Sequence, residues 1–339
     1  MIIKKYPKIS IFIPTFNEEK NIKECLNSIF CQDYPKNKLE VFVIDNESSD
    51  RTVQIAQKYP VKILYNRKIK DAQVSKRIAF DKATGELYCH FDADLRMVGK
   101  KWLIKMISPL LDDSEITASF SSFKIKGDES PLTRFLTLDW YSKDHFSCQR
   151  TPMYKFFTVS ITDTIIKKKN SYYLCLFEEG KVPPHGFGIL RKKIVERTLK
   201  FQGNKLMELD ILVHLIRLGY KKFAYVPIGA YHYFVPNLKT LLKKRLRNIK
   251  RNYVGQSFKR SYTWFNLKKP LDIIKIIIWI IYATLFIPEL IIGIYRSIRY
   301  KTWVGMYQPI VAFVETYVVI FGFLYYLTLN FLKNKHDIL

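Results

Sequence analysis

The sequence predicts an α/β fold, with a parallel sheet that carries helices on both faces. Short apolar runs typical of strands alternate with segments whose apolar residues recur at helical spacing. This alternation is typical of βαβ units, in which successive strands pair in parallel. No Gly-x-Gly-x-x-Gly fingerprint follows the first strand candidate, residues 9–14, so hydride transfer from NAD is a remote option.

Strand and helix candidates alternate along the first part of the chain. The strand candidates are residues 9–14, 39–44, 61–65 and 86–91, and the helix candidates between them are residues 19–30, 53–59 and 72–83. In the first helix Ile22, Leu26 and Ile29 share one face, and Ser and Asp residues of the helix-capping type precede the second. We therefore expect four parallel strands joined by three helices.

The pattern is less regular further along the chain. Strand candidates are residues 116–125, 223–226 and 230–234, and helix candidates are residues 132–146 and 207–218, the latter followed by Gly219. The region between residues 116 and 182 is otherwise hard to assign, and we expect it to contact an acceptor substrate.

Polar clusters follow three of the predicted strands, at residues 14–18, 45–50 and 92–94. In such sheets ligands bind beyond the carboxyl ends of the strands, where the strand order reverses, so one crevice would collect all three clusters. Alternation along a strand would point Asp92 and Asp94 to the same side. Carboxylate oxygens suit Mg²⁺ or Mn²⁺ that carries substrate phosphates. The crevice would therefore suit a ligand with a base, a ribose and a diphosphate.

Several sequence blocks stand in a fixed order along the chain. They are IFIPTFNEE at residues 11–19, CQDYP at 31–35 with VIDNESSDRT at 43–52, and ATGE at 83–86 with FDAD at 91–94. Over residues 8–251 the chain thereby resembles the family 2 inverting glycosyltransferases. The resemblance implies the Rossmann-like GT-A fold of nucleotide-diphospho-sugar transferases.

The resemblance also implies a site for the sugar donor. The residues that would bind the nucleotide sugar are Pro14, Thr15, Asn17, Glu18, Asp45, Lys76, Asp92, Ala93 and Asp94, and those that would hold Mn²⁺ or Mg²⁺ are Asp92, Asp94 and His232. Asp45 would accept hydrogen bonds from the base. Alternatives stay open at this point: Asp45 as a helix cap, Lys76 on a solvated helix face, and His232 as a structural histidine.

A general base is harder to assign. In the family a Glu-Asp pair opens the helix that ends in Gly-Tyr. Counting back from Gly219, the Asp position falls on Glu208 and the Glu position on Met207, with Asp210 two residues later. Glu208 or Asp210 would accept the proton of the acceptor hydroxyl. The alternatives are a solvated helix N-terminus stabilised by its dipole, and a phosphate acceptor that needs no base.

Charge and hydropathy divide the last third of the chain. The formal net charge is +26, and residues 236–270 contain many Lys and Arg residues but neither Asp nor Glu. Leucines at helical spacing in this segment predict a basic amphipathic helix lying on a membrane, with nucleic-acid binding as the competing interpretation. Residues 273–294 and 310–332 are each about long enough to cross a bilayer. A hairpin that only dips into the membrane is the alternative to a full crossing.

We therefore divide the chain into a nucleotide-sugar-binding half at 1–115, an acceptor-binding half at 116–235, a basic interfacial segment at 236–270, a transmembrane hairpin at 271–332 and a tail at 333–339. Five cysteines without metal-ligand spacing and no apparent signal peptide favour a catalytic domain in the cytoplasm. The expected function is transfer of a sugar from a nucleotide diphosphate to a lipid-linked or surface glycan, with membrane lipids and no nucleic acid as partners. The alternatives are a polyprenyl-phosphate glycosyl synthase and a non-catalytic membrane scaffold.

Overall fold

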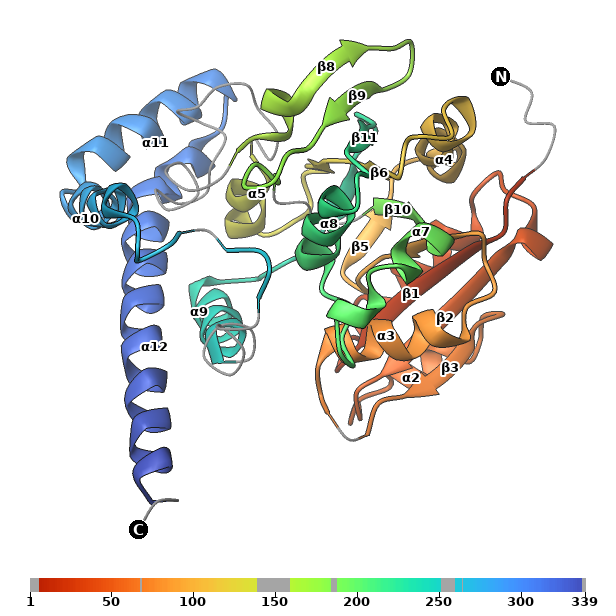
Figure 1. The fold of residues 1–339 in the computed structure, drawn as a ribbon, viewed down its shortest axis with the longest axis horizontal. Coiled ribbons are helices and arrows are strands. Elements are labelled where there is room, and N and C mark those ends of the chain that lie inside the picture. Colours follow the sequence, from red (N-terminus) through yellow and green to blue (C-terminus); the bar gives the residue numbers. More distant parts are fainter. Residues whose placement is uncertain are drawn as a thin grey trace. The chain divides into compact units, whose positions relative to one another are not determined.

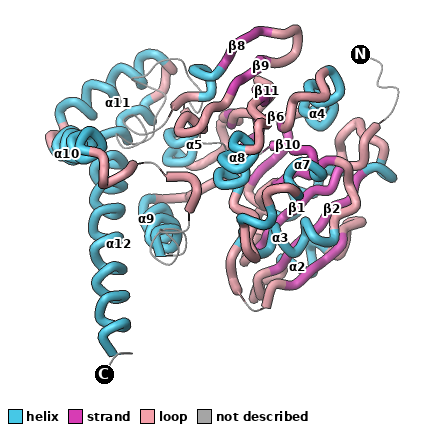
Figure 2. Tube along the Cα trace, in the orientation of Figure 1, coloured by secondary structure: helices cyan, strands magenta, loops and turns pink. Residues whose placement is uncertain are grey.

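The computed structural model describes residues 6–67, 69–138, 159–183, 188–250, 260–263 and 265–336. The chain forms two compact units, of which the first is Met1–Lys126 with Ile161–Tyr233 and the second is Gly127–Ser160 with Phe234–Leu339. Figure 1 traces the chain through them, and Figure 2 shows that the described strands belong to the first unit. Residues 127–138, which we expected in the acceptor-binding half, group with the second unit instead.

The first unit contains a mixed sheet of nine described strands in the order β3-β2-β1-β4-β10-β6-β11-β9-β8. The strands are β1 (Ile9–Thr15), β2 (Leu39–Asp45), β3 (Lys62–Tyr65), β4 (Leu87–His90), β6 (Ala118–Phe120), β8 (Ile165–Lys168), β9 (Tyr173–Leu176), β10 (Gly188–Arg191) and β11 (Lys222–Tyr225). The predicted parallel pairing is confirmed for β1 to β4. Beyond them the sheet is mixed, because β10 runs antiparallel to both neighbours and β8 and β9 form an antiparallel hairpin, whereas β11 pairs in parallel with β6.

The strand order reverses between β1 and β4. The chain runs from β1 outward to β2 and β3 and then returns to place β4 on the other side of β1. The register pairs Thr15 with Asp45 at the carboxyl ends of β1 and β2, and Phe12 with His90 near the end of β4. The polar clusters after these three strands therefore meet at one edge of the sheet, as the sequence predicts.

Six described helices complete the first unit: α1 (Ile22–Phe30), α2 (Thr52–Ala56), α3 (Ala72–Lys82), α4 (Trp102–Asp112), α7 (Lys192–Glu196) and α8 (Glu208–Arg217). The first three occupy the predicted places. Helix α3 packs against β1 and β2, and the unpredicted α4 packs against β6. The apolar face of α8 buries Ile211, Leu212 and Leu215, which fixes the direction in which its first residue points.

A second, three-stranded sheet has the order β5-β12-β7, formed by β5 (Leu95–Met97), β12 (Ala230–His232) and β7 (Phe123–Lys124). The strand predicted at residues 116–125 is therefore wrong as one strand, because β6 belongs to the large sheet and β7 to the small one. The serines between them bond to other strands: Ser121 Oγ donates to the Val226 carbonyl at 2.6 Å, and the Ser122 carbonyl accepts from Ala230 N–H at 3.0 Å. The small sheet brings β12 beside the segment after Asp94.

The second unit is helical where it is described, with α5 (Pro131–Thr137), α9 (Leu238–Asn248), α10 (Pro270–Thr284), α11 (Ile287–Arg299) and α12 (Gln308–His336). Helix α5 begins where the helix predicted at 132–146 was expected, and residues 139–146 lie outside the described ones. Leu132, Phe135, Leu241 and Val311 share one core, so α5, α9 and α12 pack together. Leu241 on the apolar face of α9 therefore packs on protein, and the predicted contact of this helix with a membrane stays a prediction.

Residues 273–294, predicted as one apolar helix, belong to two helices instead. Helices α10 and α11 meet at an angle of 72°, and Phe286 at the break has a φ of 60°. Pro288 in the first turn of α11 explains the break, because proline cannot continue a helix from the residues before it. Among the described residues, one helical segment, Trp303–Tyr325, is long and apolar enough to cross a membrane by itself. The α10–α11 pair is long and apolar enough only if the two helices count as one span.

Three charged residues of the apolar tail, Glu289, Arg296 and Glu315, are buried inside the second unit. Arg296 is fully buried and donates to the Leu138 carbonyl at 3.1 Å and to the Gln308 side chain. Gln308 donates in turn to buried Glu289 at 2.5 Å. Arg245 and Glu315 form a second ion pair at 2.7 Å. Arg296 therefore belongs to the interior of α11 rather than to an exposed connection between two spans.

Candidate active site

The loops after β1 and β2 lock together at the carboxyl edge of the sheet. Asn17 has a left-handed φ of 56°, which asparagine tolerates better than most residues. Its backbone N–H donates to Ser48 Oγ at 2.9 Å, and its Oδ1 accepts from Ser49 N–H at 2.8 Å. Glu18 N–H donates to Thr52 Oγ1 at 2.7 Å. The predicted nucleotide loop is thus held in a defined shape by the loop after β2.

Two carboxylates stabilise this pair of loops. Asp45 is buried and accepts a hydrogen bond from Ser48 N–H at 3.0 Å. Asp50 accepts from Thr52 N–H at 3.0 Å and from Glu19 N–H at 3.1 Å. Burial would raise the pKa of Asp50, but the hydrogen bonds from Thr52 outweigh it and hold that pKa below its ordinary value. Asp45 therefore stabilises the loop that follows β2.

Asp92, Ala93 and Asp94 lie in a turn that follows β4, closed by Leu95 N–H donating to the Asp92 carbonyl at 3.0 Å. The expectation that strand alternation points both carboxylates to one side is wrong, because the strand has already ended at His90. The side chain of Asp92 is 46% exposed and that of Asp94 is 11% exposed. The two carboxylates therefore have different surroundings.

Arg96 supports this turn and was missed in the sequence. Its Nη1 donates to the Ala93 carbonyl at 3.0 Å and the Leu95 carbonyl at 2.8 Å, and its Nη2 donates to Asn21 Oδ1 at 3.2 Å. Asn21 in turn donates to Glu18 at 2.8 Å. An arginine two residues after the second aspartate, within an otherwise apolar stretch, was the signal available in the sequence.

Lys76 joins two carboxylates that come from separate elements. Its Nζ lies 3.4 Å from Asp92 Oδ1 and 2.5 Å from Glu208 Oε1. Lys76 comes from the second turn of α3, Asp92 follows β4, and Glu208 is the first residue of α8. Lys76 is 4% exposed, so the alternative of a solvated helix face is wrong for it, and the ion pair likewise removes the solvated alternative for Glu208.

The charges of this cluster stabilise one another. Burial alone would lower the pKa of Lys76, but Asp92 and Glu208 reverse that effect and raise it above its ordinary value. Burial alone would raise the pKa of Glu208, but the Lys76 ammonium outweighs it and lowers that pKa to about 2. Both groups are therefore charged at neutral pH.

Asp210, the other candidate base, does not join this cluster. Two residues along a helix correspond to about 200° of rotation, which turns Asp210 away from the face that carries Glu208. Asp210 is 4% exposed and acts electrostatically on His214, one turn further along α8. The structure thus brings Glu208, and not Asp210, to Lys76 and Asp92.

His232 lies beside Asp94, as predicted. Its Nε2 is 3.6 Å from Asp94 Oδ1, and Tyr233 N–H donates to the Asp94 carbonyl at 2.9 Å. The ring stacks on Phe123 with centroids 4.6 Å apart. Imidazole and carboxylate ligands suit Mn²⁺. However, no three His, Cys, Asp or Glu side chains of the described residues are grouped closely enough to hold an ion, so the expected set of Asp92, Asp94 and His232 is not assembled here.

Comparison with known proteins identifies the class. Residues 10–173, a little under half of the chain, match the family model Glycosyl transferase family 2, so this part of the chain is similar to a family 2 glycosyltransferase domain. The fold is similar to that of a mannosyltransferase from Pyrobaculum calidifontis in complex with GDP-Man and Mn²⁺. The TM-score is 0.53 and the identity 16%, over 94% of this chain and 88% of the other. The fold is therefore of the GT-A class.

Two curated relatives act on dolichol-linked compounds, as their names state. A dolichyl N-acetyl-α-D-glucosaminyl phosphate 3-β-D-2,3-diacetamido-2,3-dideoxy-β-D-glucuronosyltransferase from Methanococcus voltae is 40% identical over 91 residues, covering 25% of this chain and 28% of its own length. A dolichol-phosphate mannosyltransferase from Pyrococcus furiosus is 33% identical over 124 residues, covering 35% of this chain and 34% of its own length. The chain spans about a third of the length of these relatives.

Proposed function

We propose that this protein is an inverting glycosyltransferase that moves a sugar from a nucleotide diphosphate to a lipid-linked or surface glycan at the cytoplasmic face of a membrane. The observation that carries the proposal is the placement of Lys76 between Asp92 and Glu208. Three charged side chains from separate elements converge where the strand order reverses, which is where α/β sheets of this kind bind ligands.

The donor side of the site follows from the loops after β1, β2 and β4. Pro14, Thr15, Asn17 and Glu18 would line the nucleotide pocket, and Asp45 would face the base. Asp94 and His232 would hold Mn²⁺ or Mg²⁺ with the phosphate oxygens completing its ligands, since such ions are often bound through one or two protein groups plus phosphates. When bound, the ion would stabilise the negative charge of the leaving diphosphate.

The acceptor side depends on Glu208. The acceptor hydroxyl oxygen would attack the anomeric carbon as the bond from that carbon to the diphosphate breaks, which inverts the configuration. Glu208 would take the hydroxyl proton as the Lys76 ammonium, which holds the pKa of Glu208 low, moves toward the diphosphate. The charge of the diphosphate increases as the bond breaks, which would favour this movement of Lys76. Asp210 faces elsewhere and is not assigned a role in this step.

The membrane would be contacted by the second unit. Exposed cations on one face of α9 and just after it, Lys239, Lys243, Arg247 and Lys250, would meet anionic headgroups. Helix α11 exposes Ile287, Ile291, Ile294 and Ile298 along one stripe, whereas Glu289 and Arg296 are buried. At 15 and 13 residues, α10 and α11 are each too short to span alone. We therefore favour a pair that dips into one leaflet over a spanning hairpin, with α12 as the membrane-crossing helix.

A second candidate activity is the glycosylation of polyprenyl phosphate itself. The Pyrococcus furiosus relative is named as a dolichol-phosphate mannosyltransferase, which favours this option. A phosphate acceptor needs no base, however, whereas Glu208 is placed and ionised as a base for a hydroxyl acceptor would be. Replacing Glu208 by Gln separates the two: a hydroxyl acceptor should lose turnover, and a phosphate acceptor should retain most of it.

The decisive test uses the full chain purified in detergent with Mn²⁺, a native lipid extract and a panel of labelled nucleotide sugars. Label that enters the organic phase with the wild type but not with Asp94→Asn supports transfer to a lipid-linked acceptor and names the donor. Glu178→Gln, which removes an exposed carboxylate of the same unit, is the matched control. No transfer to lipid or glycan from any donor would leave the non-catalytic scaffold as the better interpretation.

A further inference from the structure

The segment that leads into α8 is attached to the start of α3 by several bonds. Leu206 N–H donates to the Gln73 carbonyl at 3.0 Å, and Arg77 Nη1 donates to the Gly203 carbonyl at 2.7 Å. Both α3 residues lie within one turn of Lys76, which holds Glu208 at 2.5 Å. The position of Glu208 therefore depends on how residues 203–207 sit on α3.

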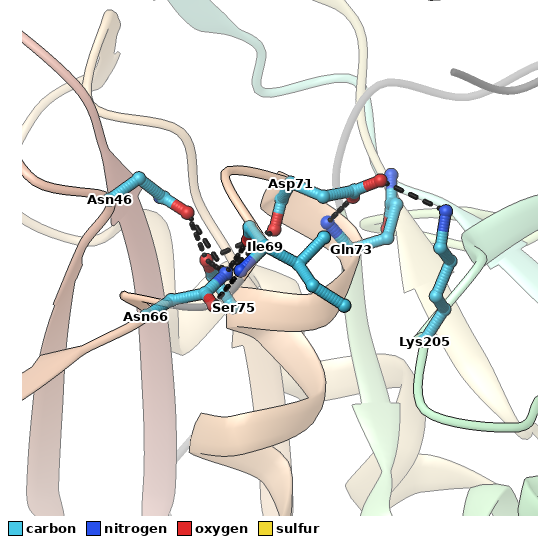
Figure 3. Close-up of polar contacts among 7 residues, drawn as sticks. All are labelled: Asn46, Asn66, Ile69, Asp71, Gln73, Ser75 and Lys205. Atoms are coloured by element: carbon cyan, nitrogen blue, oxygen red, sulfur yellow. Dashed lines mark hydrogen bonds and ion pairs between the residues drawn. The ribbon is translucent and has the colours of Figure 1, made fainter.

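A buried ion pair fixes this attachment. Lys205 Nζ lies 2.9 Å from Asp71 Oδ2, and the two side chains are 10% and 8% exposed. The other oxygen of Asp71 caps α3 by accepting from Gln73 N–H at 2.7 Å (Figure 3). Asp71 thus caps α3 with Oδ1 and pairs with Lys205 through Oδ2. A buried ion pair of this kind is costly to break, because removing one partner leaves the other charge without compensation.

The same turn of α3 is tied to the nucleotide side of the crevice. Ser75 Oγ donates to Asn46 Oδ1 at 2.8 Å, and Asn66 Nδ2 donates to the same oxygen at 3.0 Å. Asn46 Nδ2 donates to the Thr15 carbonyl at 3.0 Å, at the end of β1. Figure 3 shows this network on one side of the turn and Lys205 on the other. The first turn of α3 therefore connects the nucleotide loops to the segment before Glu208.

We propose that Asp71 and Lys205 are a positioning pair, which holds residues 203–207 on α3 so that Glu208 reaches Lys76 and the acceptor. The inference rests on the proposed function of Glu208 as the base. Neither residue touches a reacting atom in this arrangement. Their loss should therefore slow the chemical step while leaving the donor pocket intact.

The test begins with hydrogen exchange in the full-length protein, because two amide protons report on the attachment directly. Leu206 N–H bonds to Gln73, and Met207 N–H bonds to the Gln202 side chain at 3.1 Å. Asp71→Asn retains the cap on Gln73 but removes the charge, and Lys205→Met removes the other charge. Each should speed exchange at residues 206 and 207 about tenfold or more, as expected when a buried pair loses one partner.

Steady-state kinetics provide the second measurement. We expect kcat to fall about tenfold or more in each variant while the KM for the donor stays within about twofold, since displacing a reacting group by about 1 Å can cost a factor of 100. The double variant should be no worse than either single one, because the two residues act as a unit. Lys205→Arg should restore most of the rate. Lys181→Met, which breaks an exposed ion pair of the same unit, is the control.

Exchange at residues 206 and 207 that matches the Lys181→Met control would overturn the proposal, and so would faster exchange with an unchanged kcat. If Lys205→Met does not fold, Asp71→Asn, with its cap retained, decides the question. Exchange does not depend on catalysis. A wild-type protein that transfers no sugar would therefore refute the proposed function, while the exchange result would still show whether the pair holds the segment.

Discussion

At the scale of single residues, Asn46 shows how one buried side chain can hold the parts of a site together. It donates to the Thr15 carbonyl and accepts from Asn66 and Ser75, so its amide uses both of its ends. An aspartate in its place could accept both bonds but could not donate to the Thr15 carbonyl. The amide is therefore matched to Ser75 of α3, to Asn66 and to the Thr15 carbonyl.

Asn46→Asp should lower the free energy of unfolding by about 2 kcal/mol, because it places a carboxylate against a buried carbonyl and removes a donor. Urea unfolding of the detergent-solubilised protein, followed by tryptophan fluorescence, measures the change. Asn37→Asp, at an exposed position in the same unit, provides the control. Equal midpoints for the two variants would contradict the assignment of Asn46 as both donor and acceptor.

Glu40 gives a pH prediction that is independent of the active site. It accepts from Ser10 Oγ at 2.6 Å and Thr84 N–H at 2.9 Å, and it pairs with Lys62 at 2.8 Å. Burial would raise its pKa, but these partners outweigh burial and lower it to about 2. A carboxyl whose pKa is lower in the folded than in the unfolded state stabilises the fold above pH 4.5, and that stabilisation is lost as the pH falls toward 2.

Glu40→Gln should therefore cost about 3 kcal/mol of unfolding free energy at pH 7 and much less near pH 3. Urea unfolding at several pH values measures this difference. Wild-type and variant curves that stay parallel over this range would show that Glu40 is not held by these partners.

The sequence can propose most of the donor-site residues because the family motifs that carry them are local in the chain. It did not predict that Lys76 joins Asp92 to Glu208, because residues 76 and 208 come together only in the folded sheet. Arg96, Asp71 and Lys205 were missed for the same reason. Each acts through a neighbour distant in sequence, and none belongs to a short motif.

At the scale of whole elements, prediction worked where the pattern of apolar residues was periodic and failed where it was continuous. The alternating first part of the chain gave β1 to β4 and α1 to α3 nearly in place. A continuous apolar run such as residues 273–294 has no periodicity that would show which face is buried or where a helix ends. Only Pro288 indicated that it would divide into α10 and α11. Likewise, no local signal showed that β6 and β7 belong to different sheets.

The bend between α10 and α11 leads to a prediction of topology. If the pair dips into one leaflet, exposed Lys301 after α11 stays on the cytoplasmic side. In a background with Cys31→Ser and Cys148→Ser, Lys301→Cys should then react with a membrane-impermeant maleimide only after cells are permeabilised, as should Lys181→Cys in the first unit. Labelling of Lys301→Cys in intact cells would instead demonstrate a spanning hairpin.

At the scale of the whole molecule, the chain leaves the first unit at Lys126 and returns to it at Ile161. Helix α5 lies in that excursion and buries Leu132 and Phe135 in a core shared with Leu241 and Val311. A protein truncated after Tyr233 would keep α5 without the helices that cover it. The high net charge of the chain would not cover the apolar face of α5 that this truncation exposes.

Truncation after Tyr233 should therefore give aggregated protein, because the apolar face of α5 would be exposed. A second version that also replaces residues 127–160 by a short Gly/Ser linker should be more soluble and monomeric. Size-exclusion chromatography of both proteins after identical expression compares them. A monodisperse single truncation would show that α5 does not depend on the second unit for its burial.

The departure of the chain from the first unit between Lys126 and Ile161 also constrains the order in which its parts can fold during translation. Strands β1 to β4 can pair as soon as they emerge, but β10 and β11 complete the centre of the sheet only after the chain has made α5 and returned. Helix α5 must then wait for α9 and α12, which are synthesised last, before its apolar face is covered. A nascent chain of this protein would expose that face through most of translation, and chaperone or membrane contact at this stage would favour its correct assembly.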